Sequence, residues 1–323
     1  MKGANMNPKN VKKVGVIGLG KMGADWVANF LEAGFEVVGY DSSPEIFERS
    51  KKQTAGDLEW LKKKKYAEDE SFDVQVRMGK YSTVTSEEAF IQELQSCQVF
   101  LECIFEDIEL KCRLLSKFTP QMPESIVLWS NTSSLSVLTM AEACGRPNNL
   151  VGTHGMNPVH QMPAVEVVRH KKISEEALRF TTDVLTNMGK KPFVATDVSG
   201  FWVNKHLMPF MYDTYRALER GEISVADGDW GLKGSLGHPQ GVFKLSDFIG
   251  MDTMYRVGIA MYLATQDPRL YPPLIVFRMI GRNELGVKTG KGFYEWDGYK
   301  IVKPRDFSDL VIKDSNEMII LKS

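Results

Sequence analysis

The sequence lacks the features that mark membrane-spanning, secreted or nucleic-acid-binding proteins. Its 323 residues contain no apolar run of about 18 residues, the length a membrane helix needs, and no apolar signal-peptide segment near the N-terminus. Lysine and arginine number 40 against 41 aspartate and glutamate, so no basic excess is present to bind nucleic-acid or lipid phosphates. These absences favour a soluble, cytoplasmic protein with a small-molecule substrate and no nucleic-acid or membrane partner.

Cysteine is scarce and shows no pattern of a disulfide framework or a metal site. The four cysteines, Cys97, Cys103, Cys112 and Cys144, form no C-x-x-C pair and have no metal-ligand spacing with histidine. No histidine–carboxylate spacing resembles a zinc site either. We therefore expect reduced thiols that serve packing, and no bound metal.

A glycine-rich turn between a strand and a helix is the first motif with a specific chemical meaning. Residues 14–17 have the apolar, largely β-branched character of a buried parallel strand, and a helical pattern covers residues 24–33. Between them, Gly18 permits a tight turn, Gly20 lets the backbone approach a pyrophosphate, and Gly23 lets the helix pack closely. The pyrophosphate would lie on the positive N-terminus of the helix. This turn predicts cofactor contacts from Gly18, Gly20, Lys21, Met22 and Gly23.

Asp41 supports the dinucleotide interpretation of this turn. It ends a second predicted strand, residues 35–40, at the distance of about 20 residues expected for a ribose-binding carboxylate. A carboxylate there accepts hydrogen bonds from the adenosine ribose and would repel a 2′-phosphate, so NAD is favoured over NADP. A glycine turn alone also occurs in α/β proteins that bind no nucleotide.

Two further apolar segments, residues 98–103 and 125–130, predict additional strands. The second ends in a polar cluster, Asn131–Ser134. Ligands bind beyond the carboxyl ends of strands in open α/β sheets, so a nicotinamide ring and a substrate would meet at this cluster. A lysine-rich helical insert at about residues 44–78 is too long for a plain crossover and could form a lid or a substrate arm.

The chain as a whole predicts two domains. We expect an α/β fold, with a Rossmann-like doubly wound sheet in residues 1–197 and an all-helical domain in residues 198–296. A chain of 323 residues exceeds the size of about 250–300 residues at which one hydrophobic core stops growing. Residues 297–323 form a C-terminal extension, whose apolar stretch Met318–Leu321 would pack on the body or on a partner subunit.

His154 and Glu166 are candidates for an acid–base pair. A predicted strand over residues 149–154 delivers His154 at its carboxyl end, and a strand over residues 164–168 carries Glu166 in an apolar run. An ionised carboxylate in such a run needs a partner, and His154 is the obvious one. By themselves the two residues are more commonly a structural ion pair.

Taken together, these motifs resemble the L-3-hydroxyacyl-CoA dehydrogenases over nearly the whole chain. The similar segments occur in the order and at the spacing of that family. They are residues 14–41, 101–111, 130–135, 154–158, 165–167, 200–204, 237–241 and 288–294. The resemblance implies an NAD-dependent oxidoreductase of fatty acid metabolism, with a helical domain that forms most of a homodimer interface.

The resemblance also implies a role for each matching residue. His154 is the general base in alcohol oxidation, and Glu166 orients it and stabilises its imidazolium. Ser133 and Asn204 hydrogen-bond the substrate oxygen as charge develops on it. Further cofactor contacts are implied for Glu106, Lys111, Asn131 and Lys288, and further substrate contacts for Lys64 and Asn157.

Departures from the family pattern lie close to the predicted chemistry. Gly155-Met156 replaces two phenylalanines, and Pro163 stands where a lysine is common. Asp57 replaces a serine near Lys64, and a carboxylate is unfavourable beside a nucleotide phosphate. A short-chain 3-hydroxyacyl-CoA is the expected substrate, and a free 3-hydroxy acid, such as a sugar acid or a carnitine-like compound, is the alternative.

Two other classes of protein share part of this pattern. The β-hydroxyacid dehydrogenases begin with a similar turn, but they need a catalytic lysine in a glycine-rich helix, which residues 200–205 lack. A non-catalytic NAD-binding paralogue would have no use for Ser133, His154, Glu166 and Asn204 together. The sequence therefore favours an enzyme that works through a His–Glu pair.

Overall fold

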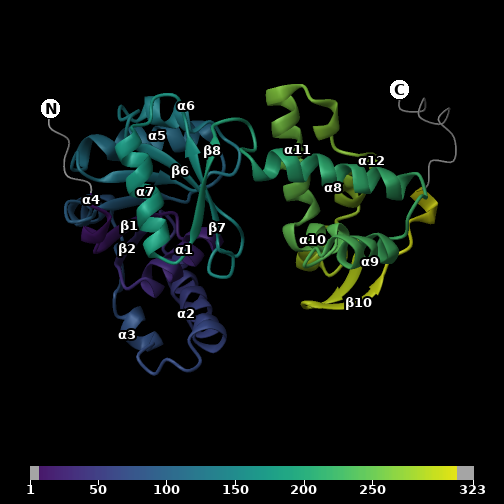
Figure 1. Cartoon of the computed structure of the whole chain (residues 1–323), viewed down its shortest axis with the longest axis horizontal. Helices are drawn as coiled ribbons and strands as arrows, with labels where there is room; N and C mark the ends of the chain where they lie inside the picture. The colour runs from purple at the N-terminus through teal and green to yellow at the C-terminus, as the bar shows by residue number, and fades with distance from the viewer. Residues whose placement is uncertain (1–6, 311–323) are drawn as a thin grey trace. The chain divides into compact units, whose positions relative to one another are not determined.

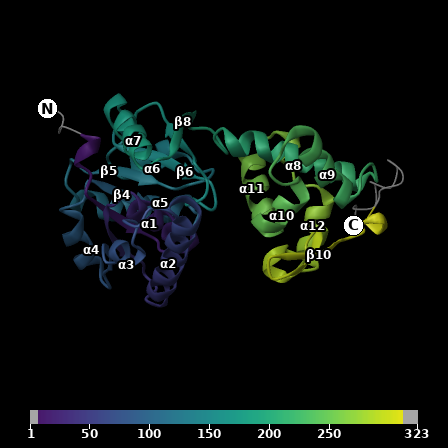
Figure 2. The ribbon, with the colours of Figure 1, turned by 60° about the horizontal axis from the view of Figure 1, so that its bottom comes forward.

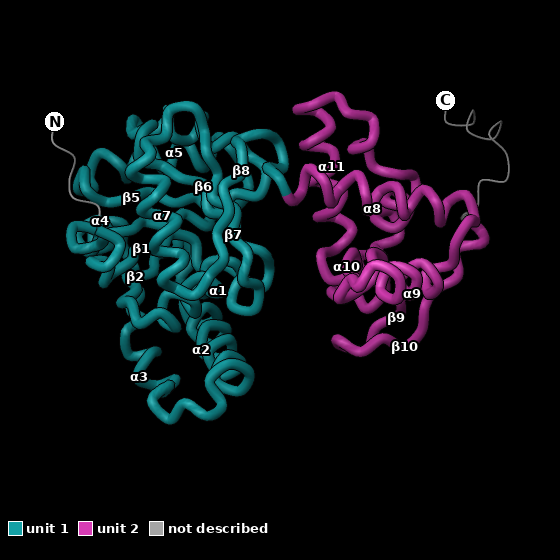
Figure 3. The backbone as a smooth tube through the Cα atoms, in the orientation of Figure 1, with its two compact units in different colours: residues 1–202 teal, residues 203–323 magenta. Residues whose placement is uncertain are grey.

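A computed structural model describes residues 7–310, which form two compact units (Figure 3). Unit 1 ends at Trp202 and unit 2 begins at Val203. The division lies later than the boundary expected after Asp197. Phe201 is buried in a core of unit 1, and the backbone N–H of Trp202 donates to Glu166, so this short stretch belongs to the first unit.

Within residues 7–202, unit 1 is built on an eight-stranded sheet with the order β3-β2-β1-β4-β5-β6-β7-β8. The strands are β1 (Lys13–Ile17), β2 (Glu36–Tyr40), β3 (Tyr81–Thr83), β4 (Val99–Glu102), β5 (Val127–Ser130), β6 (Leu150–Gly155), β7 (Ala164–Arg169) and β8 (Lys191–Thr196). The strands from β3 to β6 in this order are parallel. Strand β7 is antiparallel to β6, and β8 is parallel to β7.

Helices cover both faces of this sheet (Figures 1 and 2). They are α1 (Lys21–Glu32), α2 (Glu45–Lys65), α3 (Val74–Met78), α4 (Glu87–Leu94), α5 (Ile108–Phe118), α6 (Val137–Ala143) and α7 (Glu175–Asn187). Side chains of α1, α2 and α7 pack with Val14 and Val16 in one core, and side chains of α4, α5 and α6 pack with Ile17 in another. Successive side chains of a strand point to opposite faces, so β1 serves both cores. The expected doubly wound sheet is confirmed.

The predicted insert at residues 44–78 is α2 followed by α3, and it leads into the edge strand β3. Helix α2 packs on α1 and buries Phe47, Leu58 and Leu61 in the same core. Its last turn carries Lys62, Lys63, Lys64 and Lys65. The helical content expected for the insert is therefore present.

Over residues 203–310, unit 2 is helical apart from one hairpin. Its helices are α8 (Val203–Glu219), α9 (Val225–Leu236), α10 (Val242–Ile249), α11 (Met251–Thr265) and α12 (Leu274–Gly281), and its strands are β9 (Tyr294–Asp297) and β10 (Lys300–Pro304). Short 3-10 turns of unit 2 cover Pro268–Leu270, Val287–Thr289 and Ser308–Leu310, and those of unit 1 cover Pro8–Asn10 and Thr119–Gln121. The hairpin crosses the expected start of the C-terminal extension at residue 297. The apolar stretch Met318–Leu321 lies outside the described residues.

Asp247 joins the hairpin to the helices of unit 2. Its two carboxylate oxygens accept hydrogen bonds from Phe293 N (2.8 Å), Tyr294 N (2.9 Å) and Trp296 Nε1 (2.8 Å). Asp247 lies on α10, so these bonds hold the start of β9 against that helix. Among the helices of residues 7–310, none combines the length and apolar character needed to cross a membrane.

The burial of Asp247 predicts a pH-dependent stability. Burial raises the pKa of this carboxyl from 3.8 to about 6. Because the pKa is higher in the folded than in the unfolded chain, the group favours folding below pH 3.8, and this contribution is lost as the pH rises through about 6. An amide does not titrate, so the variant Asp247→Asn lacks this pH dependence. The difference in free energy of unfolding between Asp247→Asn and the natural chain should therefore shift by about 2–3 kcal/mol in favour of the variant between about pH 4 and about pH 8. Urea unfolding of both proteins at the two pH values measures this difference, and an equal difference at both would contradict the assignment.

Candidate active site

The glycine turn brings α1 directly against the end of β1. Gly18 has a φ of +87°, and a Cβ there would lie 2.6 Å from the carbonyl carbon of Cys103. A Cβ on Gly23 would lie 1.9 Å from the carbonyl oxygen of Gly18. A Cβ on Gly20 would meet nothing within 4 Å, so the backbone of this residue is open to a ligand. An open backbone at a helix N-terminus suits a pyrophosphate.

Asp41 follows β2 beside the same turn. Its Oδ2 accepts from Leu19 N at 2.8 Å and its Oδ1 accepts from Ser43 N at 3.1 Å. A cavity of about 90 Å³ adjoins it, lined by Ile17, Gly18, Tyr40, Asp41, Ser42, Glu87, Ile104, Leu114 and Phe118. Carboxylate oxygens have further lone pairs, so Asp41 can accept more hydrogen bonds at this cavity, and its contact with a ribose stays a prediction.

A buried ion pair lies at the carboxyl end of β4. Lys111 Nζ lies 2.6 Å from Glu102 Oε1 and 3.4 Å from Glu106 Oε2, and it donates to Ile104 O at 3.2 Å. Burial by itself lowers the pKa of Lys111, but the two glutamates outweigh burial and the pKa is raised. Lys111 is 1% exposed. Its ammonium therefore holds the two glutamates in place.

Glu106 in turn organises the loop that carries Ser133. Its Oε1 accepts from Thr132 Oγ1 (2.7 Å), Ser133 N (2.7 Å) and Ser134 N (3.2 Å). The structure thus brings Glu106, Lys111 and Ser133 together at one edge of the sheet. Three donors on one carboxylate oxygen fix the loop backbone beyond β5.

His154 and Glu166 face each other across the antiparallel strands β6 and β7. His154 Nδ1 lies 2.6 Å from Glu166 Oε2, and Glu166 Oε1 accepts from Trp202 N at 2.9 Å. Glu166 is fully buried and His154 is 7% exposed. The ring of Phe201 packs on the imidazole, with centroids 5.9 Å apart. The predicted pair is therefore present, and the carboxylate holds the imidazole by its Nδ1.

Asn131 is fixed from two sides at the end of β5. Its Oδ1 accepts from Trp26 Nε1 at 2.7 Å and from Gly155 N at 3.2 Å. A Cβ on Gly155 would lie 2.9 Å from Cζ2 of Trp26. The Trp26 indole thus takes the space beside Gly155, which explains why no bulky side chain follows His154 here.

Asp25, the neighbour of Trp26 on α1, forms a buried cluster with His160 and Asp57. Asp25 accepts from Val159 N (2.5 Å), His160 N (2.9 Å) and His160 Nδ1 (2.5 Å), and Asp57 Oδ1 lies 3.7 Å from that ring nitrogen. The ligand atoms of Asp25, Asp57 and His160 lie within 4.8 Å of one another, a grouping that could hold a metal ion. The contacts that the structure shows in this grouping are the hydrogen bonds of His160 to Asp25.

Asp57 on α2 directs its carboxylate toward His160. Its side chain is 16% exposed and turns inward to His160. Burial raises its pKa to about 6. The expected conflict between this carboxylate and a substrate phosphate is therefore smaller than the sequence implies.

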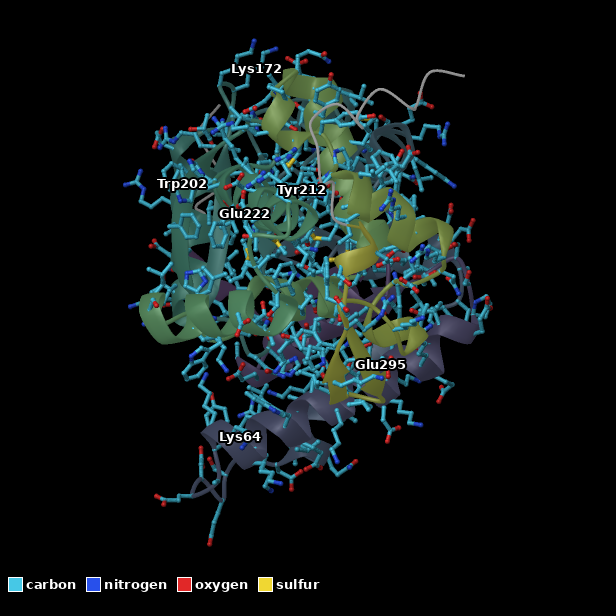
Figure 4. The ribbon with its side chains drawn as sticks, turned by 90° about the vertical axis from the view of Figure 1, so that its right-hand side faces the viewer. Lys64, Lys172, Trp202, Tyr212, Glu222 and Glu295 are labelled. Carbon is cyan, nitrogen blue, oxygen red and sulfur yellow. The ribbon has the colours of Figure 1, made fainter. Side chains whose placement is uncertain are left out.

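A cavity of about 280 Å³ lies beside α2, between that helix and the segment following His160. Its lining residues include Trp60, Lys64, Lys65, His160 and Lys190. Lys190 donates to Val159 O (2.5 Å) and Met162 O (3.2 Å), and burial lowers its pKa to about 8. Lys64 is exposed on α2 (Figure 4), so a cationic surface is available here for an anionic ligand.

Three other residues predicted for the site are Asn157, Asn204 and Lys288. Asn157 is exposed and precedes Pro158 through a cis peptide bond. Asn204 lies in the first turn of α8, and Lys288 pairs with Asp252, both within unit 2. Their contacts with cofactor or substrate stay predictions.

The sequence does not predict a site role for Asp25, Trp26, Glu102 or Lys190. One signal was available for Asp25, because a charged residue inside a helix of buried apolar residues requires a partner. No signal identified the partner, since Asp25 and His160 lie 135 positions apart in the chain.

Comparison with known sequences covers both units. The sequence model of the 3-hydroxyacyl-CoA dehydrogenase NAD-binding domain matches residues 13–198, and that of the C-terminal domain matches residues 200–296. The chain is 32% identical over 287 residues to the mitochondrial hydroxyacyl-coenzyme A dehydrogenase of Sus scrofa, across 88% of this chain and 91% of that protein. It is 31% identical over 284 residues to a probable 3-hydroxybutyryl-CoA dehydrogenase of Deinococcus radiodurans, across 88% of this chain and 100% of that protein.

A solved structure agrees with these sequence matches. The crystal structure of (S)-3-hydroxybutyryl-CoA dehydrogenase from Ralstonia eutropha superimposes with a TM-score of 0.81 at 28% identity, covering 89% of this chain and 100% of that one. The fold, the NAD-binding domain and the predicted resemblance are thereby confirmed. The chain belongs to the 3-hydroxyacyl-CoA dehydrogenase family of NAD-dependent oxidoreductases.

Proposed function

We propose that this protein reversibly oxidises the 3-hydroxyl group of a short-chain 3-hydroxyacyl-CoA to the 3-keto compound. The observation that carries the proposal is the His154–Glu166 pair, which lies on β6 and β7 of the same sheet that carries the glycine turn. A structural ion pair would not require the hydrogen-bonded Ser133 loop at the same edge of the sheet.

The four cysteines are free thiols, which supports work in a reducing compartment such as the cytoplasm.

The hydrogen bond to Glu166 defines the acid–base role of His154. A neutral imidazole that donates from Nδ1 has its lone pair on Nε2, so Nε2 is the atom that takes the proton of the 3-hydroxyl. Glu166 stabilises the imidazolium that results. NAD, when bound, accepts the hydride from C3 of the substrate, and in reduction His154 returns the proton to the oxygen.

Ser133 and Asn204 are proposed to hydrogen-bond the reacting oxygen. Ser133 is supported by the contact of its backbone with Glu106, which holds the loop in one conformation. Donors that are fixed before the reaction stabilise developing charge without reorganising. Asn204 contributes an amide from the first turn of α8.

The CoA part of the substrate is proposed to use α2. Lys64 beside the cavity of about 280 Å³ supplies positive charge for phosphates, whereas the charge of the neighbouring Lys65 is paired with Glu32 at 2.6 Å. Asn157 is exposed on the segment after His154. The inward turn of Asp57 supports this assignment over a CoA-independent reaction.

A substrate panel tests the proposal directly. NADH formation should be fastest with 3-hydroxybutyryl-CoA, slower with longer 3-hydroxyacyl-CoA esters, and negligible with free 3-hydroxybutyrate, sugar acids or carnitine, because only the CoA esters engage the lysines of α2. Turnover of free 3-hydroxy acids without turnover of any CoA ester would replace the proposed substrate class. No turnover of either class would favour a non-catalytic paralogue.

Substitution of His154 tests the acid–base role. His154→Ala should lower kcat by about 10²–10⁴-fold, the usual contribution of a positioned acid–base group, while the Kd for NADH changes little. His170 offers a matched control, because it is also a buried histidine but its Nε2 bonds the backbone carbonyl of Leu150 at 2.9 Å. His170→Ala should retain turnover, and equal losses in both variants would count against a catalytic His154.

We also propose a homodimer formed through unit 2. Leu263 on α11 is 66% exposed, and Tyr271 beside α12 is 47% exposed. Tyr271 contacts Tyr262 and Phe277, with ring centroids 5.1 and 6.1 Å apart, so an aromatic surface covers this side of the unit. Exposed apolar surface of this kind favours association with another subunit.

Sedimentation tests the dimer and its surface. The natural chain should sediment as a dimer, and Leu263→Glu should shift it toward monomer because a carboxylate would be buried without a partner. Val302→Glu on β10, at a position that is 59% exposed, is the control and should leave the dimer intact. A monomeric natural chain would refute the proposal.

A further inference from the structure

Helix α1 carries two adjacent buried side chains that hydrogen-bond away from the helix. Trp26 is fully buried and Asp25 is 1% exposed. Each side chain reaches the part of the chain around His154, which lies far away in sequence.

Trp26 holds the start of the segment Gly155–His160. Its indole N–H donates to Asn131 Oδ1 at 2.7 Å, and the same oxygen accepts from Gly155 N at 3.2 Å. Its ring fills the space where a side chain at Gly155 would lie. One indole thus joins α1, the end of β5 and the residue next to His154.

Asp25 holds the other end of the same segment. Its carboxylate accepts the backbone N–H groups of Val159 and His160 and the imidazole N–H of His160. Asp25 accepts from the backbone N–H of Val159, and Lys190 Nζ donates to the carbonyl oxygen of the same residue. Residues 155–160 are therefore linked to α1 at both ends, through Asn131 at Gly155 and directly at Val159 and His160.

We propose that Asp25 and Trp26 are positioning residues for hydride transfer. They fix the distance between α1, whose first turn would bind the NAD pyrophosphate, and the strand that presents His154 to the substrate oxygen. This inference rests on the proposed function. Hydride and proton transfer need the reacting atoms at about 3–3.5 Å, and a misplacement of about 1 Å can cost about 10²-fold in rate. The bond from Trp26 to Asn131, which also accepts from Gly155 N, and the bonds from Val159 and His160 to Asp25 link the cofactor helix to the segment that follows His154, and they oppose such a displacement.

Trp129 provides a matched control for the hydrogen bond of Trp26. Both indoles are fully buried, and they belong to one aromatic cluster with centroids 6.4 Å apart. The N–H of Trp129 donates to Thr181 Oγ1 on α7 at 2.9 Å. Replacing either tryptophan by phenylalanine removes one indole N–H and a similar volume. The two variants differ in the bond that is lost, because Trp26 donates to Asn131 and Trp129 donates to Thr181.

The test compares Trp26→Phe with Trp129→Phe. We expect kcat with 3-hydroxybutyryl-CoA to fall by about 10–100-fold in Trp26→Phe and to change less than about threefold in Trp129→Phe. The primary deuterium isotope effect on kcat, measured with substrate deuterated at C3, should rise only in Trp26→Phe, because hydride transfer becomes slower than product release. Equal losses in the two variants with an unchanged isotope effect would overturn the proposal and leave only a packing role.

Asp25→Asn and Asp57→Asn form a second pair in case Trp26→Phe folds poorly. The amide in Asp25→Asn would keep one acceptor oxygen but lose the charge that binds two backbone N–H groups, whereas Asp57 approaches the His160 ring only at 3.7 Å. Asp25→Asn should lower kcat by about tenfold with a raised isotope effect, and Asp57→Asn should change neither. Equal kinetics in this pair would overturn the role of Asp25.

A cofactor measurement separates this inference from the proposed function. If the natural chain turns over no 3-hydroxyacyl-CoA, the proposed function fails, and titration with NADH still decides the positioning role. The fluorescence of bound NADH reports the surroundings of the nicotinamide. It should change in Trp26→Phe and stay the same in Trp129→Phe, with the Kd for NADH within about threefold in both. Identical bound-NADH fluorescence in the two variants would refute the positioning role independently of any substrate.

Discussion

The antiparallel pairing of β6 with β7 is the constraint on which the site depends. It sets His154 opposite Glu166, and directly opposed residues of an antiparallel pair place their side chains on the same face. Glu166 is fully buried, so its charge must be satisfied within the protein. The imidazole of His154 and the backbone N–H of Trp202 do so together.

Hydrogen bonds to charged side chains also fix the surrounding loops. Lys111 neutralises Glu102 and approaches Glu106, which in turn fixes the backbone at Ser133. Asp25 performs the corresponding task for the segment after His154. In each case a carboxylate accepts backbone N–H groups of a loop that has no strand or helix partner for them. These loops therefore owe their shape to ionised side chains contributed by other elements.

The departures from the family pattern gain a physical explanation from these contacts. Gly155 follows His154 because Trp26 occupies the adjoining space and shares Asn131 with its backbone. Asp57 turns toward His160 and does not remain open beside Lys64. Substitutions that look unrelated in the sequence are neighbours in the structure, and they reshape one region between α1, α2 and the segment after His154.

The amino-acid sequence by itself determined the strand–turn–helix at residues 14–33, the helical insert and the helical second unit. It also predicted six of the eight strands of the sheet, and β3 and β8 were not predicted. These features are local, because strand and helix periodicity and the glycine requirement of the turn depend on neighbouring residues. It also identified His154 and Glu166, since a carboxylate in an apolar strand needs a partner. Only the tertiary structure decided the partners of Asp25, Trp26 and Lys111 and the inward turn of Asp57. It alone showed the β9–β10 hairpin, which Asp247 holds against α10. Those contacts join residues far apart in the chain, and no periodic pattern within the sequence specifies which distant donor meets a buried acceptor.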